Sequence, residues 1–272
     1  MTAEARSNAP VVDANPSFWH QLHIQRRVIW ALTMRETITR FGREGLGTIW
    51  MVAEPAMFIV GVMVIFSHIE SHATYSIAEY LAVSYPTLLF WRNGANRVTK
   101  SLEINRALLH HQPIHPIDII YSRILLEFTG AAGAFFILYL VFVQLGICRW
   151  PASILTMALG YLLVIWFSFA FVLIMGALTE LSETVERISH IILYLMIPFS
   201  GVFIPLYIIP ERFRELLLYV PLVDAVEYFH SGYYGAAMPT YYHLDYTVLA
   251  ILVMTLFGYA LTNVAIRRVQ LN

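Results

Sequence analysis

Long apolar stretches separated by short polar segments dominate the pattern of this chain. A helix that crosses a bilayer needs about 20 mostly apolar residues, because lipid offers the backbone no hydrogen-bond partners. The stretches predict six transmembrane helices, over residues 48–67, 73–91, 128–148, 150–179, 188–210 and 246–266. The third helix is expected to start earlier, near Asp118. The second contains Glu79 and Pro86 and is the weakest of the six, so five or seven crossings stay open as alternatives.

The composition is that of a membrane protein. Apolar residues make up 58% of the chain and charged residues 13%, which leaves no large soluble portion to build a core of its own. Fourteen of the 17 Lys and Arg residues fall in residues 1–47, 92–123, 180–187 and 267–272. Cytoplasmic loops carry an excess of basic residues. We therefore predict an all-α membrane protein with both termini in the cytoplasm.

The segment before the first apolar stretch is polar and then amphipathic. Residues 1–16 form an N-terminal tail, in which Asn15 and Pro16 are typical of a helix start. Residues 17–47 are predicted to form an amphipathic helix that lies along the cytoplasmic membrane surface. Its apolar side consists of Phe18, Leu22, Ile29 and Leu32. A simple anchor without a further role is the alternative.

Glycines and a tryptophan mark the place where the chain enters the membrane. Three glycines within residues 42–47 break the surface helix. Trp50 follows at a depth where indole rings favour the interface. Arg40 and Arg43 are expected to meet lipid phosphates or an anionic substrate, although these features also fit an ordinary membrane boundary.

The loop between the second and third stretches contains a short amphipathic pattern. Val98, Leu102 and Leu109 recur at helical spacing, and Pro113 ends the run. A helix with such a face can fill a groove on a soluble partner. It can equally lie flat on lipid headgroups.

Two motif-like features in this loop do not indicate a site. The string GANRVTKS, residues 94–101, approaches a phosphate-binding loop, but Thr99 replaces the second glycine that the backbone needs. His110, His111 and His115 have no acidic or Cys ligand close by, so we expect a solvated loop and no metal site. The chain also has no G-x-S-x-G or H-E-x-x-H motif, so an enzyme is not favoured.

Two carboxylates lie beside or within apolar stretches. An ionised carboxylate in hydrocarbon costs about 2.5 to 3.5 kcal/mol on insertion scales. Glu127 lies four residues after Arg123, the spacing of a same-face helical pair, so a structural salt bridge is predicted. Glu54 is expected to hydrogen-bond a neighbouring helix. A proton relay through either carboxylate is the alternative.

Proline and glycine interrupt the apolar pattern over residues 198–245. The pieces between the prolines are too short to span a bilayer. We predict a helix broken near Pro198 or Pro205, followed by short re-entrant helices in the outer leaflet before the last crossing. Non-helical backbone at that depth needs protein or water around it, which a translocation path would supply.

Three features together resemble the permease subunit of ABC-2 type exporters. They are the R-x-x-R-x-x-x-G-x-x-W-x-x-x-x-P pattern over residues 40–55, the W-R-N-x-x-N-R stretch over residues 91–97 and the broken fifth helix. More narrowly, the chain is similar to the inner-membrane permeases that export group 2 capsular polysaccharide in Gram-negative bacteria. The resemblance runs from about residue 18 to the C-terminus, and it identifies residues 48–272 as a six-helix transmembrane domain.

The resemblance implies a homodimer in the bacterial inner membrane, bound to two copies of a separate ATPase that holds the ATP and Mg. The cargo would be a lipid-linked, usually acidic polysaccharide, handed on to periplasmic and outer-membrane export proteins. No cofactor in this chain and no nucleic acid are expected. Residues 97–112 would be the coupling helix that docks on the ATPase. The residues expected at this contact are Val98, Leu102, Arg106 and Leu109.

The resemblance also implies that the first and fifth crossings line the path at the dimer seam. Aromatic faces suit sugar rings, and Arg side chains suit phosphate or carboxylate groups. The candidate path residues are Trp50, Phe58, Phe66, Tyr85, Trp91, Tyr194, Phe199 and Phe203. The candidates for the lipid-phosphate end are Arg40, Arg43, Arg92 and Arg97. Lipid-facing or interhelical packing is the alternative for each aromatic.

The same residues distinguish this function from its alternatives. O-antigen, teichoic-acid and drug permeases of the ABC-2 type are the nearest alternatives. An ATP-independent channel or carrier would use Glu54 or Glu127, whereas a permease should lose transport when residues 97–112 are altered. A membrane-bound lipid-modifying enzyme would need a cluster of His and carboxylate residues at one interface, which the sequence does not assemble.

Overall fold

The computed structural model describes residues 18–41, 46–66, 76–111 and 114–271, and its regular structure over these residues is entirely helical. Within these described ranges, three helices are long and apolar enough to cross a membrane. They are α6 (Pro116–Gln144), α7 (Ile154–Leu181) and α11 (Leu244–Leu271). These three crossings were predicted, and α6 begins close to the predicted Asp118.

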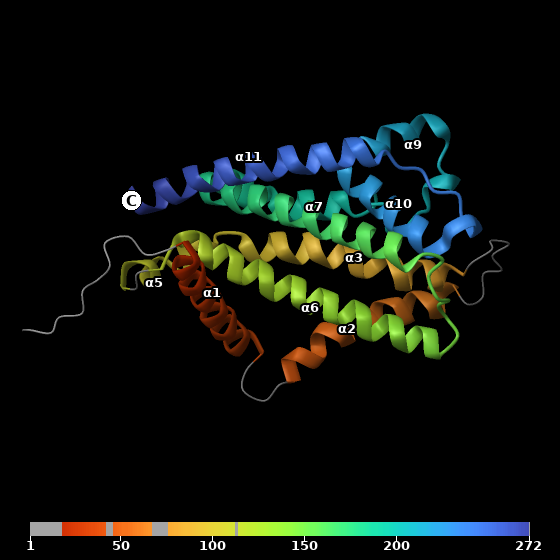
Figure 1. Ribbon diagram of the computed structural model, residues 1–272, viewed down its shortest axis with the longest axis horizontal. Helices are drawn as coiled ribbons and strands as arrows, with labels where there is room; N and C mark the ends of the chain where they lie inside the picture. The colour runs from red at the N-terminus through yellow and green to blue at the C-terminus, as the bar shows by residue number, and fades with distance from the viewer. Residues whose placement is uncertain (1–17, 42–45, 67–75, 112–113, 272) are drawn as a thin grey trace, which may run out of the picture.

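The long helices run side by side with α3 (Ile77–Val98) in one bundle (Figure 1). The remaining helices are α1 (Phe18–Phe41), α2 (Leu46–Phe66), α4 (Ser101–Ile104), α5 (Arg106–His111), α8 (Glu183–Met196), η1 (Leu206–Ile208), α9 (Glu211–Leu218), α10 (Pro221–Tyr234) and η2 (Gly235–Ala237). At one end of the bundle lie α1, α5 and the C-terminus, and at the other lie α9 and α10 (Figure 1). The first is termed the linker end, because α4 and α5 link α3 to α6 there, and the second the α9 end.

Helix α7 lies at the centre and packs against α3, α10 and α11. Glycines allow these close approaches. A Cβ atom on Gly176 would lie 2.4 Å from Cγ1 of Val98, and one on Gly160 would lie 2.4 Å from Cα of Phe229. Small residues that let backbones approach are the usual means of helix association in membranes, where no hydrophobic force holds helices together.

The predicted fifth crossing, residues 188–210, is not one continuous helix. Helix α8 ends at Met196, and Gly201 then has a φ of +72°, in the left-handed region that glycine adopts without strain. Its 14 residues give α8 a length of about 21 Å, less than the thickness of a bilayer. The break falls near Pro198, one of the two positions predicted for it.

The second apolar stretch forms a longer helix than predicted. Helix α3 begins at Ile77, where the Ser76 hydroxyl accepts a hydrogen bond from the Glu79 N–H at 3.0 Å. It contains Pro86 and continues past the predicted end at Trp91 to Val98. The polar residues that follow Trp91 therefore belong to the bundle and not to a loop.

The predicted single helix over residues 97–112 is wrong. The chain breaks at Lys100, whose φ of 52° lies in the left-handed region that few side chains adopt. Two short helices, α4 and α5, follow, and Asn105 between them donates a hydrogen bond to the Ser101 carbonyl at 2.9 Å. We refer to residues 99–111 as the linker.

A helix, α1, lies within the range 17–47 predicted for the surface helix, and it packs against α6. Leu32 is buried in this contact, and the Gln25 amide donates to the Asp118 carboxylate at 2.9 Å. Apolar side chains are also exposed away from α6, among them Phe18 and Trp30. The helix is therefore attached to the bundle by one side and leaves apolar side chains free on the others.

Gly160 and Gly133 provide a test of the close packing of α7. Both lie inside helices, so replacing either with Ala brings the same gain in helix propensity, up to about 1 kcal/mol. A Cβ atom meets the Phe229 backbone at Gly160 and nothing within 4 Å at Gly133. Gly160→Ala should lower the free energy of unfolding by about 1–3 kcal/mol through overpacking, and Gly133→Ala should not. Equal melting temperatures of the two purified variants in detergent would contradict this packing.

Candidate functional site

Three of the candidate path aromatics come together in space. Phe58 of α2 stacks on Tyr85 of α3, with ring centroids 4.2 Å apart and ring planes 16° apart. Phe203, from the segment after α8, lies edge-on to both rings at 6.1 and 6.4 Å. Such pairs each contribute about 0.5–1.5 kcal/mol beyond the area they bury. This aromatic cluster joins three segments that are far apart in the sequence.

The other candidate aromatics are spread over different environments. Trp50, Tyr194 and Phe199 are exposed on the surface of the bundle. Trp91 is fully buried and packs edge-on against Phe171 of α7 at 5.9 Å. Its assignment to the path is corrected to an interhelical packing role. The side chain of Phe66 lies outside the described residues.

Glu127 of α6 lies at the centre of an ion-pair network at the linker end. It is 4% exposed and pairs with Arg40 of α1 and, at 3.1 Å, with Arg97 of α3. A buried carboxylate without cationic partners would be strongly destabilising. Two candidate arginines therefore serve at least partly as counter-charges that hold α1, α3 and α6 together. The side chain of Arg43 lies outside the described residues.

The predicted pair between Arg123 and Glu127 is wrong. Arg123 lies 3.7 Å from Glu36 of α1 and donates a hydrogen bond to the Arg97 carbonyl at 2.7 Å. An Arg that precedes a Glu by four residues is the less favourable order for a helical pair. Cationic side chains from α1 and α3 reach Glu127 instead.

Arg92 and Glu54 lie close to this network. The Arg92 guanidinium lies over the ring of Tyr194, 5.2 Å from its centroid, which is a cation–π contact between α3 and α8. Glu54 is exposed and lines a pocket of about 30 Å³ together with Arg40 and Glu127. That volume has room for a water molecule or two. A proton or an ion could be relayed there, but a sugar could not be held.

Two of the three apolar residues predicted to contact a partner lie inside the bundle. Val98 and Leu102 are both 0% exposed. Val98 packs against Gly176, and the Leu102 N–H donates to the Glu180 carboxylate at 2.7 Å. Their helical spacing reflects burial against α7. Leu109 is half-buried.

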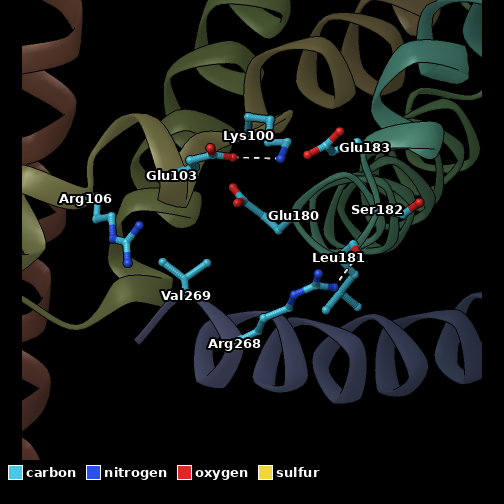
Figure 2. Close-up of a pocket in the computed structure, with 9 residues that line it drawn as sticks. All are labelled: Lys100, Glu103, Arg106, Glu180, Leu181, Ser182, Glu183, Arg268 and Val269. Atoms are coloured by element: carbon cyan, nitrogen blue, oxygen red, sulfur yellow. Dashed lines mark hydrogen bonds and ion pairs between the residues drawn. The ribbon is translucent and has the colours of Figure 1, made fainter. Parts of the chain in front are cut away.

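Charged groups bind the linker to α7 and α8, and α7 to α11, around a pocket of about 170 Å³ (Figure 2). Glu180 at the end of α7 holds the start of α4, and the Lys100 ammonium lies 2.7 Å from Glu103 and 3.7 Å from Glu186 of α8. Arg268 of α11 donates to the Leu181 carbonyl at 2.5 Å. The hydrogen bond with Glu103 raises the pKa of Lys100 above its ordinary value and lowers that of Glu103.

The linker surface that remains accessible differs from the predicted one. Ile104 is 68% exposed, and Glu103, Arg106 and Ala107 beside it are exposed as well. Of the predicted contacts, Arg106 alone is exposed. Sequence reasoning overlooked Glu180, although a carboxylate directly after a long uncharged stretch is a signal that could have found it.

The α9 end is fixed by another buried carboxylate. Glu79 of α3 accepts two hydrogen bonds from Arg149, at 2.7 and 3.1 Å, and a third from the Tyr233 hydroxyl of α10 at 2.9 Å. The bond to Glu79 raises the pKa of Arg149. A bidentate Arg–carboxylate pair is geometrically specific, so α3, α10 and the segment before α7 are held in one arrangement.

Ser84, His230 and Glu227 form a triad-like row. The Ser84 hydroxyl lies 2.7 Å from Nε2 of His230, and Nδ1 of His230 lies 3.6 Å from Glu227. Nucleophilic catalysis needs this order of groups and also needs access for a substrate. All three residues are 0% exposed, so the arrangement ties α3 to α10 and gives no site for acyl transfer.

The Glu127 network generates a stability prediction. Glu127→Gln removes the counter-charge of Arg40 and Arg97, which are themselves partly exposed. We therefore expect the free energy of unfolding to fall by about 1–3 kcal/mol. Glu183→Gln is the matched control, because its pair with Arg187 is exposed on both sides and such pairs contribute about 0–1 kcal/mol. Melting temperatures in detergent measure both effects, and a Glu127→Gln variant as stable as the control would refute a structural role for the network.

Several known proteins are similar to this chain over most of its length. The chain is 34% identical to the capsule polysaccharide export inner-membrane protein CtrC of Neisseria meningitidis serogroup B, over 91% of its own length and 94% of the relative. It is 32% identical to the capsule polysaccharide export inner-membrane protein BexB of Haemophilus influenzae, over 89% and 92%. It is 29% identical to the polysialic acid transport protein KpsM of Escherichia coli, over 88% and 93%.

The profile of the ABC-2 type transporter family matches residues 27–234. This range runs from α1 through the ion-pair network and the linker to the end of α10. The match covers most of the chain. The chain therefore belongs to the ABC-2 type transporter family.

Proposed function

We propose that this chain is the permease subunit of an ATP-driven exporter that moves lipid-linked capsular polysaccharide across the bacterial inner membrane. The observation that carries the proposal is the match to a capsule polysaccharide export inner-membrane protein over 91% of this chain and 94% of that relative. A match of this extent includes the crossings, the linker and the interrupted segment after α8. It therefore concerns the whole transport unit and not one motif.

The proposed topology has six crossings. Helices α2, α3 and α8, the last with the segment after it, would complete the three formed by α6, α7 and α11. The linker end would be cytoplasmic, with both termini, and α1 would lie on the cytoplasmic membrane surface. The α9 end would be periplasmic, with residues 198–245 forming the re-entrant region. The basic residues near the linker end support this orientation.

The proposed assembly is a homodimer with two copies of an ABC ATPase, which would hold the ATP and Mg. No cofactor would be bound by this chain. Large apolar side chains are exposed on α2 and on α8, among them Val64, Ile65, Ile191 and Leu195. This supports a seam formed by the first and fifth crossings. Periplasmic and outer-membrane export proteins would receive the polymer.

The proposed path uses weak contacts, because a tight site would stall a moving polymer. Sugar rings would slide over the aromatic cluster, and anionic groups at the lipid-linked end would meet Arg92 and Arg97 at the cytoplasmic mouth. Arg97 is about half exposed, although it also pairs with Glu127, so it can offer donors to a phosphate.

The proposed coupling runs through the linker. An ATPase beneath it would contact Ile104 and Arg106, which are exposed. Because α4 follows α3 directly and is bonded to α7 through Glu180, a push on the linker would move both helices. The linker would act as a rigid part of the bundle and not as a detachable helix.

Export by a capsule-producing cell that lacks its own permease tests the proposal. Cells that express this chain with its partner ATPase should display capsule at the surface, measured with an anti-capsule antibody, and cells without it should accumulate polymer inside. If the cells instead displayed surface O-antigen or became resistant to a drug, without surface capsule, the chain would be one of the other ABC-2 permeases. That result would contradict the capsule assignment.

In the same cells, Phe58→Ala should lower surface capsule by about two- to tenfold, as expected for the loss of contacts of about 0.5–1.5 kcal/mol. Phe257→Ala, at an exposed position on α11, is the matched control and should export normally. Equal export by the two variants, at equal protein levels, would remove the aromatic cluster from the path.

Ile104→Asp tests the coupling surface. The added charge should lower the polymer-stimulated ATP hydrolysis of the co-purified ATPase by about tenfold or more, since an unpaired carboxylate would be buried at the contact. The chain should still fold, because Ile104 is exposed. Gln270→Asp, which adds the same charge at the exposed end of α11, is the control. The ATPase co-purified with this variant should hydrolyse ATP at the wild-type rate. Unchanged hydrolysis with the Ile104→Asp variant would place the contact elsewhere.

A further inference from the structure

A polar cavity of about 340 Å³ lies at the α9 end of the bundle. Helix α9 forms one wall, and residues 240–243, the segment that leads into α11, form the other. The volume lies at the lower end of the range of about 300–1,000 Å³ that small-molecule sites occupy. The residues that line the cavity are Glu215, Leu218, Thr240, Tyr241, Tyr242 and His243. None of them belongs to the aromatic cluster or the linker, so the cavity is separate from both.

Two buried carboxylates of α10 hold the second wall in place. Glu227 accepts a hydrogen bond from the Tyr241 N–H at 3.1 Å. Asp224 accepts one from the His243 N–H, which lies 2.8 and 2.9 Å from its two oxygens. Both carboxylates are 0% exposed, and buried polar groups need such donors. The wall is therefore fixed before any ligand binds, which lowers the entropic cost of binding.

The two walls are joined to each other by side-chain contacts. The Arg214 guanidinium of α9 lies over the ring of Tyr241, 3.8 Å from its centroid, which is a close cation–π contact. Tyr241 also packs against a small apolar cluster that includes Leu218 of α9. These contacts hold α9 against the segment that leads into α11.

Four polar side chains of the lining form no hydrogen bond within the described chain. They belong to Glu215, Thr240, Tyr242 and His243. Thr240 is half-buried and the other three residues are exposed, so a ligand can reach them. A carboxylate, two hydroxyls and an imidazole can both accept hydrogen bonds from a ligand and donate hydrogen bonds to it.

The lining distinguishes between classes of ligand. It includes no Lys or Arg, so a phosphate or an acidic sugar would have no counter-charge there. No group of three metal-binding side chains occurs in the described part of the chain. The polar groups do not suit an acyl chain. A neutral sugar unit matches the lining, because its hydroxyls donate and accept hydrogen bonds and its C–H faces pack against tyrosine rings.

We propose that this cavity binds a neutral sugar unit of the exported polysaccharide, with Glu215, Thr240 and Tyr242 hydrogen-bonded to its hydroxyl groups. The inference rests on the proposed function, in which the α9 end faces the periplasm and meets the polymer as it leaves. Because the side chains are accessible to water, each contact is weak, as the passage of a polymer requires. The site would retain the emerging segment between successive cycles of the ATPase.

Saturation-transfer difference NMR, which detects weakly bound ligands, tests the proposal on the detergent-purified chain. The probe is a set of oligosaccharide fragments of the capsule polymer. Wild-type protein should transfer signal to the fragments. Thr240→Trp, which fills the cavity, should abolish the transfer, and Thr240→Ser, which keeps the hydroxyl, should preserve it. No transfer from wild-type protein, or equal transfer from the Thr240→Trp variant, would overturn the site.

A milder pair of variants serves if tryptophan prevents folding. Glu215→Gln should weaken binding of the fragments by about two- to tenfold, the effect of one weakened hydrogen bond. Glu211→Gln is the matched control, because Glu211 is exposed on the same helix but lies outside the cavity, and it should bind as wild type does. Equal binding by the two variants would overturn the role of Glu215 and with it the site.

Surface capsule in cells that express each variant separates this inference from the proposed function. If wild-type protein exports capsule but transfers no signal to the fragments, the sugar site is wrong and the proposed function stands. If export then also fails with Thr240→Trp, the cavity belongs to a periplasmic protein and not to a sugar. If wild-type protein exports no capsule, the proposed function and the inference are both overturned.

Discussion

The hydrogen bond between the Leu102 N–H and the buried Glu180 carboxylate joins the linker to the central helix of the bundle. Glu180 lies at the end of the most apolar of the three long crossings and is 9% exposed, so its carboxylate needs a donor that stays in place. Lys100 and Arg268 hold the same corner to α8 and α11. The linker is thereby attached to α7 and α8, and the end of α7 is attached to α11.

Further contacts fix the helices of the bundle to one another at both ends. Glycine contacts keep α7 too close to α3 and α10 for independent sliding. Glu127 joins α1 to α3 and α6 near the linker, and Glu79 joins α3 to α10 at the opposite end. Each carboxylate is neutralised by arginine, as low-dielectric surroundings require. Tyr85 of the aromatic cluster lies on α3, between these two fixed points.

Local patterns predicted what depends on local sequence. The lengths of the apolar runs gave α6, α7 and α11, and Pro198 gave the break after α8. Helical spacing indicated that Val98 and Leu102 lie on one apolar face, but not that the bundle buries this face in place of a partner. The left-handed Lys100 has no periodic signal, and the partners of Glu127 come from helices 30 or more residues away. Three predicted aromatics meet in one cluster, whereas Trp91 packs inside, because spacing does not tell a lined path from a packed interface.

The central claim is that this chain moves cargo only when a separate ATPase acts on its linker. Transport of a fluorescent lipid-linked polysaccharide into sealed proteoliposomes, with the chain alone and with the co-purified ATPase, tests it most directly. We predict ATP-dependent accumulation with the ATPase and none without it. Accumulation against a gradient by the chain alone would contradict the account.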